Sequence, residues 1–380
     1  MKSLDTSSHR NSHEPDWHAL LDRALTGEGM TAHFQPIVDV ARGVIVGYEA
    51  PTRFVGLPGA GPELWFAEAR RQGRFGALEA LALERALAAR DDLPGRAFLA
   101  VNVSPDVLDD PAVQRVWNDQ PDLDGVVVEL TEHARIDSYV ALEPALNRLR
   151  AAGARIAIDD AGAGYAGLQH LVGLRPHVIK LDRHLVAGVD RDETKRALVE
   201  MIVAFASRID ARVLAEGVER LGELDALIRL GVPLAQGYLL GSPAPPWCEL
   251  DRRGVALLMQ QVPPRSQHTL RRILERTATV YDESTAPSAF TDDSTDLVVM
   301  LDLQQRPVAT MDADGLVHSA LDPSMRVRVD TSVTAAAERA LTRPPGQRFH
   351  PLLCVDDQGR YVGVVRMERV LTYLTARSQD

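Results

Sequence analysis

The sequence contains two cysteines, Cys248 and Cys354, among 380 residues. So few cysteines exclude a disulfide framework and a thiolate zinc site, and they suit a reducing compartment. No apolar run approaches the roughly 18–20 residues that a membrane helix needs. Residues 1–15 lack the apolar stretch of a signal peptide. We therefore expect a cytoplasmic protein that does not contact a membrane.

The sequence also has fewer basic than acidic residues. The 42 Lys and Arg residues are outnumbered by 53 Asp and Glu residues, giving a formal net charge of -11. Proteins that bind DNA or anionic membranes concentrate positive charge, so neither is an expected partner. A small anionic ligand in a locally basic pocket is still compatible with this composition. The length predicts two or three domains of about 100–200 residues each.

Between residues 16 and 246, short apolar runs alternate with longer helical patterns. The apolar runs are Thr31–Val38, Val44–Tyr48, Ala97–Val103, Val126–Leu130, Ala154–Ile158, Val178–Leu181, Arg212–Ala215 and Pro233–Ala235. The helical patterns include Leu78–Ala89, Ala141–Ala152 and Lys195–Ile209. This alternation predicts an α/β fold with a mostly parallel sheet, and eight strands suit a (β/α)8 barrel. A doubly wound open sheet is the alternative, although no glycine-rich dinucleotide fingerprint follows the first strand.

The flanking segments differ in character. Residues 1–15 read as a disordered tail, followed by an amphipathic helix from Trp17. Residues 247–285 read as a helical linker, with helices expected over 253–261 and 269–283. Residues 286–380 contain a repeat, because Leu301–Val308 resembles Val355–Val362, 54 residues later. A strand–turn–strand unit that occurs twice predicts a small α+β domain. The alternative is that the two hairpins are unrelated.

Polar side chains interrupt or follow the ends of seven of these apolar runs. They are Glu49, Asn102, Glu129, Asp159, Asp160, Lys180, Glu216 and Gln236. A single acidic residue in such a place is usually a helix cap or a solvated turn. A whole series of strands that end this way indicates instead that the polar side chains converge at the C-terminal mouth of a barrel, where the active sites of such folds lie.

Five carboxylates in one mouth would repel each other strongly unless cations neutralised them. Oxygen ligands with an asparagine as neutral donor suit Mg²⁺ or Mn²⁺, and the adjacent Asp159 and Asp160 could serve two ions. Two such ions about 3.5–4 Å apart are the usual arrangement for phosphodiester hydrolysis. Lys180 could orient the attacking water or offset charge in the transition state.

At these residues the sequence resembles the EAL domain family of bacterial cyclic di-GMP phosphodiesterases and their degenerate relatives. The resemblance covers roughly residues 17–246 in order and spacing. It rests on Phe34–Asp39, Gly47–Ala50, Val101–Ser104, Glu129–Glu132, Asp159–Asp160, Lys180–Asp182, Ala215–Glu219 and Gln236–Tyr238. It implies a modified TIM (β/α)8 barrel whose first strand is antiparallel to the others. It also implies Mg²⁺- or Mn²⁺-dependent opening of cyclic di-GMP to the linear dinucleotide pGpG by a homodimer.

The resemblance also implies roles, residue by residue. The implied metal ligands are Glu49, Asn102, Glu129, Asp159 and Asp160, and the residues that handle water are Lys180 and Glu216. The implied ligand contacts are Gln35, Arg53 and Gln236, with Arg53 directed toward phosphate. Glu132 would support the loop after Asp160, and Glu219 would be structural.

Two departures from the family pattern suggest an alternative function. Proline occupies residue 51, where the family signature has leucine, and Ala161–Gly167 lacks the usual phenylalanine, threonine and serines. Fewer anchors predict a looser loop and slower turnover. The alternative is therefore a catalytically weak or inactive domain that acts as a cyclic di-GMP receptor or a protein-interaction module.

The C-terminal repeat carries a second, weaker resemblance. Residues 351–365, followed by a helix expected over Met367–Ala376, resemble one half of a CBS pair. Such pairs often bind adenine nucleotides and regulate a neighbouring domain. A docking or dimerisation module without a ligand explains the pattern equally well.

Overall fold

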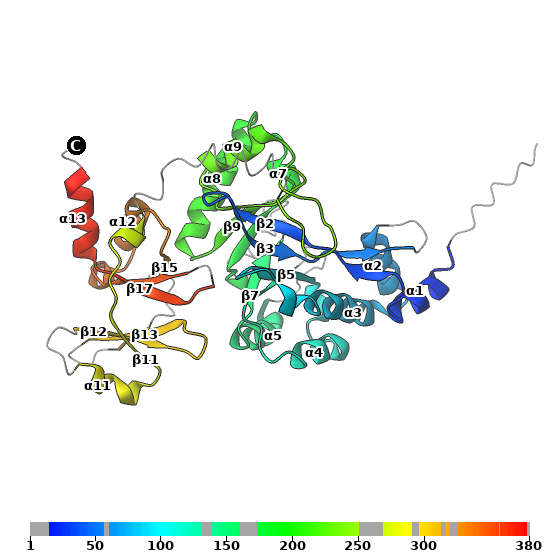
Figure 1. The fold of residues 1–380 in the computed structure, drawn as a ribbon, viewed down its shortest axis with the longest axis horizontal. Coiled ribbons are helices and arrows are strands. Elements are labelled where there is room, and N and C mark those ends of the chain that lie inside the picture. Colours follow the sequence, from blue (N-terminus) through cyan, green and yellow to red (C-terminus); the bar gives the residue numbers. More distant parts are fainter. Residues whose placement is uncertain are drawn as a thin grey trace, which may run out of the picture.

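The protein forms a closed eight-stranded barrel joined to a smaller C-terminal α+β domain (Figure 1). The computed structural model describes residues 15–56, 61–130, 139–159, 173–250, 269–290, 296–312, 317–319, 326–356 and 358–377. The predicted tail therefore lies almost wholly outside the described residues. Within the described ranges, no helix is both long enough and apolar enough to cross a membrane.

The barrel strands follow the predicted apolar runs closely. They are β2 (Gln35–Asp39), β3 (Val44–Glu49), β5 (Phe98–Val103), β6 (Val126–Leu130), β7 (Arg155–Ile158), β8 (Val178–Leu181), β9 (Arg212–Ala215) and β10 (Leu234–Ala235). The strand β2 is antiparallel to its neighbours β3 and β10, whereas the remaining neighbours pair in parallel. The prediction of a barrel with an inverted first strand is confirmed, and the open sheet is excluded.

The apolar side chains of the barrel pack in two layers. Inside the barrel lies a small cluster that includes Ile37, Phe98, Val127 and Leu214. A larger cluster fills the space between the strands and the surrounding helices. These helices are α3 (Phe75–Leu87), α4 (Pro111–Asn118), α5 (Tyr139–Ala151), α7 (Arg183–Val186), α8 (Glu193–Arg208) and α9 (Leu221–Arg229). Burial on both faces explains why the strands read as continuous apolar runs.

The run Thr31–Val38 is divided between two sheets. The strand β1 (Met30–Ala32) leaves the barrel and pairs with β4 (Thr52–Phe54). This two-stranded sheet lies beside α1 (Trp17–Leu25) and α2 (Pro62–Arg71), and Trp65 is fully buried among them. The expected helix from Trp17 is confirmed, with Asp16 accepting a hydrogen bond from the amide of Ala19 as its N-cap.

The C-terminal domain is built from two similar units. One contains β11 (Ala278–Val280), α11 (Ala286–Ala289), β12 (Leu297–Leu301), β13 (Pro307–Asp312) and β14 (Val317–Ser319). The other contains β15 (Arg326–Arg328), α12 (Val333–Leu341), β16 (Leu352–Val355), β17 (Tyr361–Val365) and α13 (Met367–Arg377). In each unit a parallel strand pair is followed by an antiparallel hairpin, and both hairpins shift register at the same place in the repeat.

The helix expected over residues 269–283 is wrong. Only Leu270–Arg272 form a short 3-10 turn there, and β11 joins the sheet through parallel pairing with β12. Thr277, Thr279 and Val280 are β-branched and suit a pleated strand better than a helix. The helix expected over 253–261 lies outside the described residues. The helix from Met367 is confirmed as α13.

Gly237, the second residue after β10, has no room for a side chain. Its φ is +155°, and a Cβ atom would lie 2.2 Å from the backbone nitrogen of Val218. We expect Gly237→Ala to lower the free energy of unfolding by about 1–3 kcal/mol through overpacking. Urea denaturation would measure the loss. Gly346→Ala is the matched control because a Cβ atom there meets nothing within 4 Å; an equal loss in both variants would contradict the packing argument.

His177 precedes β8 at the N-terminal end of the barrel. Burial lowers the pKa of its imidazole to about 3, and the charges of Arg155, Arg150, Arg326 and Arg306 act in the same direction. The neutral ring accepts a hydrogen bond at Nδ1 from the amide of Ile156 (3.1 Å). The folded state therefore disfavours a proton that the unfolded state takes up near pH 6.5.

This depressed pKa predicts a specific acid sensitivity. The stability contribution of neutral His177 is present above about pH 6.5 and is lost as the pH falls toward 3. Relative to His177→Gln, the wild type should lose about 1.4 kcal/mol of unfolding free energy for each pH unit below about 6. Urea denaturation between pH 7.5 and 5 would measure this difference. His184→Gln, at a side chain that is 97% exposed, should follow the wild type; a parallel profile for His177→Gln would refute the assignment.

Candidate active site at the mouth of the barrel

The polar residues singled out in the sequence meet at the C-terminal mouth of the barrel. Gln35 opens the inverted strand β2 and pairs with Glu49 at the end of β3. Asn102 on β5 pairs with Glu129 on β6. Asp159 and Glu216 directly follow β7 and β9, Gln236 follows β10, and Lys180 lies within β8. Because parallel strands end at the same rim, these side chains share one small volume.

Lys180 is the centre of this cluster. Its side chain is 1% exposed, and its Nζ atom donates a hydrogen bond to Oε2 of Glu129 (2.6 Å). The same Nζ atom lies 2.5 Å from Oε1 of Glu216, 3.5 Å from Oδ1 of Asp159 and 3.9 Å from Oε2 of Glu49. One ammonium group therefore faces four carboxylates.

Glu49 is held by side-chain amides. Asn102 donates a hydrogen bond to Oε1 of Glu49 (2.9 Å), and Gln236 donates one to Oε2 (2.5 Å). Gln236 also donates to Oε1 of Gln35 (2.8 Å). These contacts join β2, β3, β5 and β10 across the mouth and fix the direction of the Glu49 carboxylate. The Oε1 atom of Gln236 is buried and has no hydrogen-bond partner among the described residues.

The buried charges shift one another's protonation. Burial would lower the pKa of Lys180, but Asp159, Glu129, Glu216 and Glu49 raise it well above its usual range, so the ammonium stays charged. Burial raises the pKa of Glu129 to about 8, against the attraction of Lys180. Burial likewise raises the pKa of Glu216 well above its usual range. Burial also acts to raise the pKa of Glu49, but Lys180 and the two amides outweigh it and the pKa is lowered.

These shifts show that the cluster is short of positive charge. Glu129 and Glu216 tend to keep a proton chiefly because both carboxyl groups are buried, and the charges of the neighbouring carboxylates add to this effect. Within the described ranges, no three acidic, histidine or cysteine side chains already converge as a ready metal-binding group, since the carboxylates turn toward Lys180. The donor set of carboxylate and amide oxygens nevertheless fits Mg²⁺ or Mn²⁺, and a dication would supply the missing charge.

Two further predicted site residues, Arg53 and Glu219, make their polar contacts outside this cluster. Arg53 on β4 donates to the carbonyl oxygen of Thr52 (2.9 Å), although its charge still helps to lower the pKa of Glu49. Glu219 forms a surface ion pair with Arg183 (2.7 Å), and its structural role stays a prediction. Asp160, Glu132 and the altered loop 161–167 lie outside the described residues.

Pro51 lies where the chain leaves the barrel. Glu49 keeps its register with Ala100, and the amide of Ala50 donates to the carbonyl oxygen of Ala100 (2.9 Å). The carbonyl oxygen of Pro51 accepts a hydrogen bond from His33 (3.0 Å). Proline between β3 and β4 therefore leaves the carboxylate of Glu49 at the mouth.

Sequence reasoning missed Glu79 on α3. Burial raises the pKa of its carboxyl to about 8, and the group interacts with the backbone amide of Ser104 just beyond β5. It therefore lies behind the strand that carries Asn102. Nothing in the helical pattern of residues 78–89 distinguishes Glu79 from a solvated residue, so burial was the missing information.

Comparison with known proteins agrees with this geometry. The family model described as the EAL domain matches residues 18–243. Cyclic di-GMP phosphodiesterase NbdA of Pseudomonas aeruginosa is 32% identical over 240 residues, which cover 59% of this chain and 30% of NbdA. The first curated relatives are matched over 28–31% of their own length, so this chain spans less than a third of each in the match.

Solved structures show the same fold. The PaMucR phosphodiesterase in complex with cyclic di-GMP is 28% identical, with a TM-score of 0.54 over 60% of this chain and 98% of that chain. Klebsiella pneumoniae BlrP1 in a complex with manganese and cyclic di-GMP is 32% identical, with a TM-score of 0.51 over 57% of each chain. The matched regions correspond to the barrel in extent.

Proposed function

Because the chain belongs to the EAL domain family, we propose that its barrel hydrolyses cyclic di-GMP to linear pGpG. The proposed reaction uses two bound ions, either Mg²⁺ or Mn²⁺. The observation that carries this proposal is the convergence of Glu49, Glu129, Asp159 and Glu216 around Lys180 at one mouth. A buried excess of carboxylates is costly for a protein unless cations use it. The relatives named as phosphodiesterases and the manganese complex of BlrP1 support the same reading.

The proposed metal ligands are Glu49, Asn102, Glu129, Asp159 and Asp160. When bound, the ions would polarise the phosphate and lower the pKa of a coordinated water. The amides of Asn102 and Gln236 hold the Glu49 carboxylate in place, so a ligand group is preorganised before the ion arrives. This arrangement limits the reorganisation that binding requires.

Lys180 and Glu216 are the proposed handlers of the water. The Nζ atom of Lys180 can donate to the water and to the phosphate oxygens. The charge of bound dications would favour the ionised form of Glu216, and its carboxylate beside Lys180 would then accept the water proton. Hydrolysis adds one water across one P–O3′ bond, and the proton finishes on the departing 3′ oxygen. Gln35, Arg53 and Gln236 are the proposed ligand contacts, with the free Oε1 of Gln236 offering an acceptor.

A receptor without turnover is the second candidate. The observation that favours it is the sequence Ala161–Gly167, which has lost the anchoring side chains typical of the family. A loosely held loop lowers turnover more than it lowers ligand binding. The homodimer, and an adenine nucleotide at the C-terminal domain, stay predictions.

Chromatography of the reaction products separates the two candidates. Purified protein with Mg²⁺ or Mn²⁺ should convert cyclic di-GMP to pGpG, and Ca²⁺ should inhibit because its looser geometry misplaces the water. The same samples would be titrated for cyclic di-GMP binding. Tight binding with no linear product in either metal would establish the receptor and refute the enzyme.

A further inference from the structure

The two hairpin turns of the C-terminal domain have the same internal structure. Oδ1 of Asp302 accepts hydrogen bonds from the amides of Gln304 (2.9 Å) and Arg306 (2.8 Å). Oδ1 of Asp356 accepts from the amides of Gln358 (2.9 Å) and Arg360 (2.9 Å). The repeat therefore presents two arginines, Arg306 and Arg360, from equivalent places on neighbouring turns.

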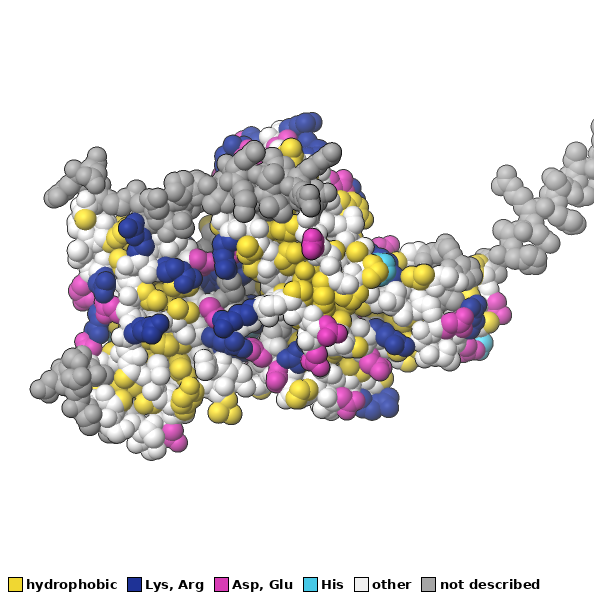
Figure 2. Space-filling model, viewed as in Figure 1, with side chains coloured by type: hydrophobic (Ala, Val, Ile, Leu, Met, Phe, Trp, Pro, Cys, Tyr) yellow, Lys and Arg dark blue, Asp and Glu magenta, His cyan; other side chains and the backbone are white. Residues whose placement is uncertain are grey.

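Both arginines reach the same carboxylate on the barrel. Nη2 of Arg306 lies 3.2 Å from Oδ1 of Asp124, while Nη2 of Arg360 contacts Oδ2. The Nη2 atom of Arg306 also donates to the carbonyl oxygen of Gly153 (2.7 Å). The side chains of Asp124 and Arg306 are each 20% exposed, so water screens this contact less than a surface pair. Figure 2 shows Lys and Arg side chains grouped over the C-terminal domain and its boundary with the barrel.

A third arginine of the C-terminal domain contacts the barrel at another loop. Nη1 of Arg339 on α12 lies 3.4 Å from Oδ1 of Asp210, in the loop before β9. Arg339 is 8% exposed and Asp210 is 18% exposed at the side chain. The domain thus contacts Asp124 before β6, Gly153 before β7 and Asp210 before β9.

Each contacted residue lies five or six residues before a member of the active-site cluster. Asp124 precedes Glu129, Gly153 precedes Asp159 and Asp210 precedes Glu216. A strand rises about 3.3 Å per residue, so each contact is about 17–20 Å from its carboxylate. The strands β6, β7 and β9 each pair with a neighbouring strand on both sides, which makes them stiff connections rather than free chain.

Gly153 shows how tightly the first contact is packed. Its φ is +107°, and a Cβ atom would lie 3.0 Å from the backbone nitrogen of Asp124. The amide of Leu123 also donates to the carbonyl oxygen of Ala152 (2.8 Å). The loops before β6 and β7 are therefore closely packed against each other, and Arg306 contacts both.

We infer that Asp124 and Asp210 are positioning residues for the proposed hydrolysis, through which the arginines of the C-terminal domain set the placement of Glu129, Asp159 and Glu216. The inference rests on the proposed function for its kinetic readout. Displacements of about 1 Å in a reacting group reduce rates about a hundredfold. Smaller shifts transmitted along β6, β7 and β9 therefore change turnover without a contact to the substrate.

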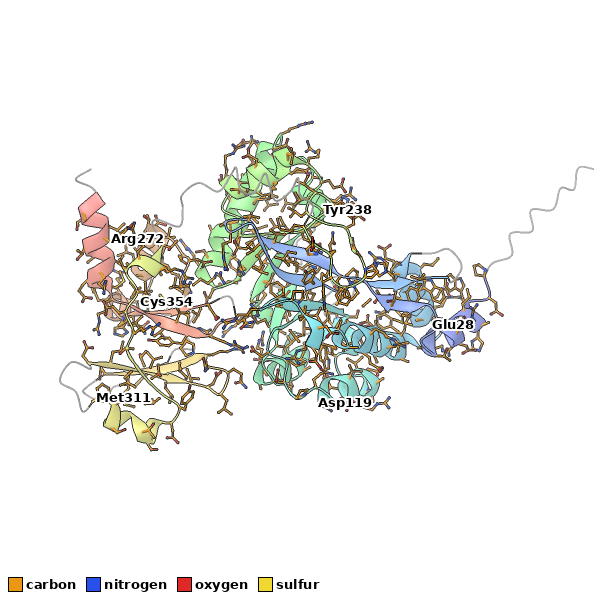
Figure 3. The ribbon with its side chains drawn as sticks, in the orientation of Figure 1. Glu28, Asp119, Tyr238, Arg272, Met311 and Cys354 are labelled. Atoms are coloured by element: carbon orange, nitrogen blue, oxygen red, sulfur yellow. The ribbon has the colours of Figure 1, made fainter. Side chains whose placement is uncertain are left out.

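The test compares Asp124→Asn and Arg306→Ala/Arg360→Ala in the full chain. Each should lower kcat about tenfold and leave KM within about twofold, since the ligand contacts lie at the other end of the barrel. Adding Asp124→Asn to the double arginine variant should cause no further loss, because removal of Arg306 and Arg360 already abolishes both ion pairs of Asp124. Asp119→Asn is the matched control, since Asp119 lies exposed at the end of α4, away from the C-terminal domain (Figure 3), and should keep kcat unchanged.

Hydrogen exchange distinguishes failure of this inference from failure of the proposed function. If the wild type hydrolyses cyclic di-GMP, an unchanged kcat in both variants overturns the inference. If the wild type shows no hydrolysis, the proposed function fails, and hydrogen exchange then tests the inference by itself. Faster exchange in residues 126–130 and 155–158 of both variants, relative to Asp119→Asn, would then support the coupling, and equal exchange would overturn it.

Discussion

Lys180→Met is expected to lower hydrolysis of cyclic di-GMP by about a hundredfold or more. The substitution keeps an unbranched side chain, shorter by one atom, and removes the charge that faces Glu129, Glu216, Asp159 and Glu49. The proposed hydrolysis then lacks the group that orients the water and offsets charge on the phosphate. Product chromatography at saturating Mn²⁺ would measure the loss.

The same variant should also be less stable when no divalent ion is present. Removing one partner of a buried ion pair costs about 3–5 kcal/mol because the other charges stay uncompensated. Saturating Mn²⁺ should recover part of this loss, since the ion takes over the compensation. Urea denaturation in chelator and in Mn²⁺ would show both effects.

Lys195→Met is the matched control for Lys180→Met. The chain has three lysines, and Lys195 lies on α8, where it donates to the carbonyl oxygen of Ala187 (2.6 Å) at the surface. Its replacement should leave hydrolysis unchanged. Full activity in Lys180→Met would contradict the role given to the ammonium group.

Glu49→Ala is expected to lower the rate of hydrolysis to about a thousandth or less of the wild-type rate, while the fold is retained. A metal ion contributes several kcal/mol to phosphodiester hydrolysis, and about 4 kcal/mol corresponds to a thousandfold. Loss of the carboxylate leaves the amides of Asn102 and Gln236 without their acceptor, which costs about 1–3 kcal/mol. Relief of repulsion with the neighbouring carboxylates offsets part of that cost.

Activity and circular dichroism together would test Glu49→Ala. Glu200→Ala makes the same change at an exposed residue of α8 and should behave as the wild type. Unchanged turnover in Glu49→Ala, with a normal spectrum, would refute Glu49 as a metal ligand. Loss of the helical spectrum would instead assign the residue to folding.

The barrel could be predicted from the sequence because its strands carry two signals at once. Runs such as Val126–Leu130 are buried on both faces, and their polar ends repeat at the spacing of a strand–helix–strand unit. The same pattern located Glu49, Asn102, Glu129, Asp159, Lys180, Glu216 and Gln236 at one mouth. Periodicity was less informative for residues 269–283, where short apolar stretches suit a helix or a strand and only the pairing of β11 with β12 decides.

Contacts between distant segments were beyond sequence reasoning. The repeat was visible, and it contained Arg306 and Arg360, but nothing in it shows that both side chains reach Asp124. The central place of Lys180 among the carboxylates likewise depends on the closure of the barrel, which brings β3, β6 and β8 together. The hydrogen bond from Arg53 to the carbonyl oxygen of Thr52 on its own strand could not be predicted either, and its contact with phosphate stays a prediction.

Calorimetric titration with Mn²⁺ tests the central claim most directly, because the claim is that the clustered carboxylates exist to hold dications. The wild type should take up Mn²⁺ and release protons from groups such as Glu129, whose pKa is raised to about 8. Glu49→Ala should bind it much more weakly, and Glu200→Ala should match the wild type. Absence of Mn²⁺ uptake by the folded wild-type protein would contradict the account.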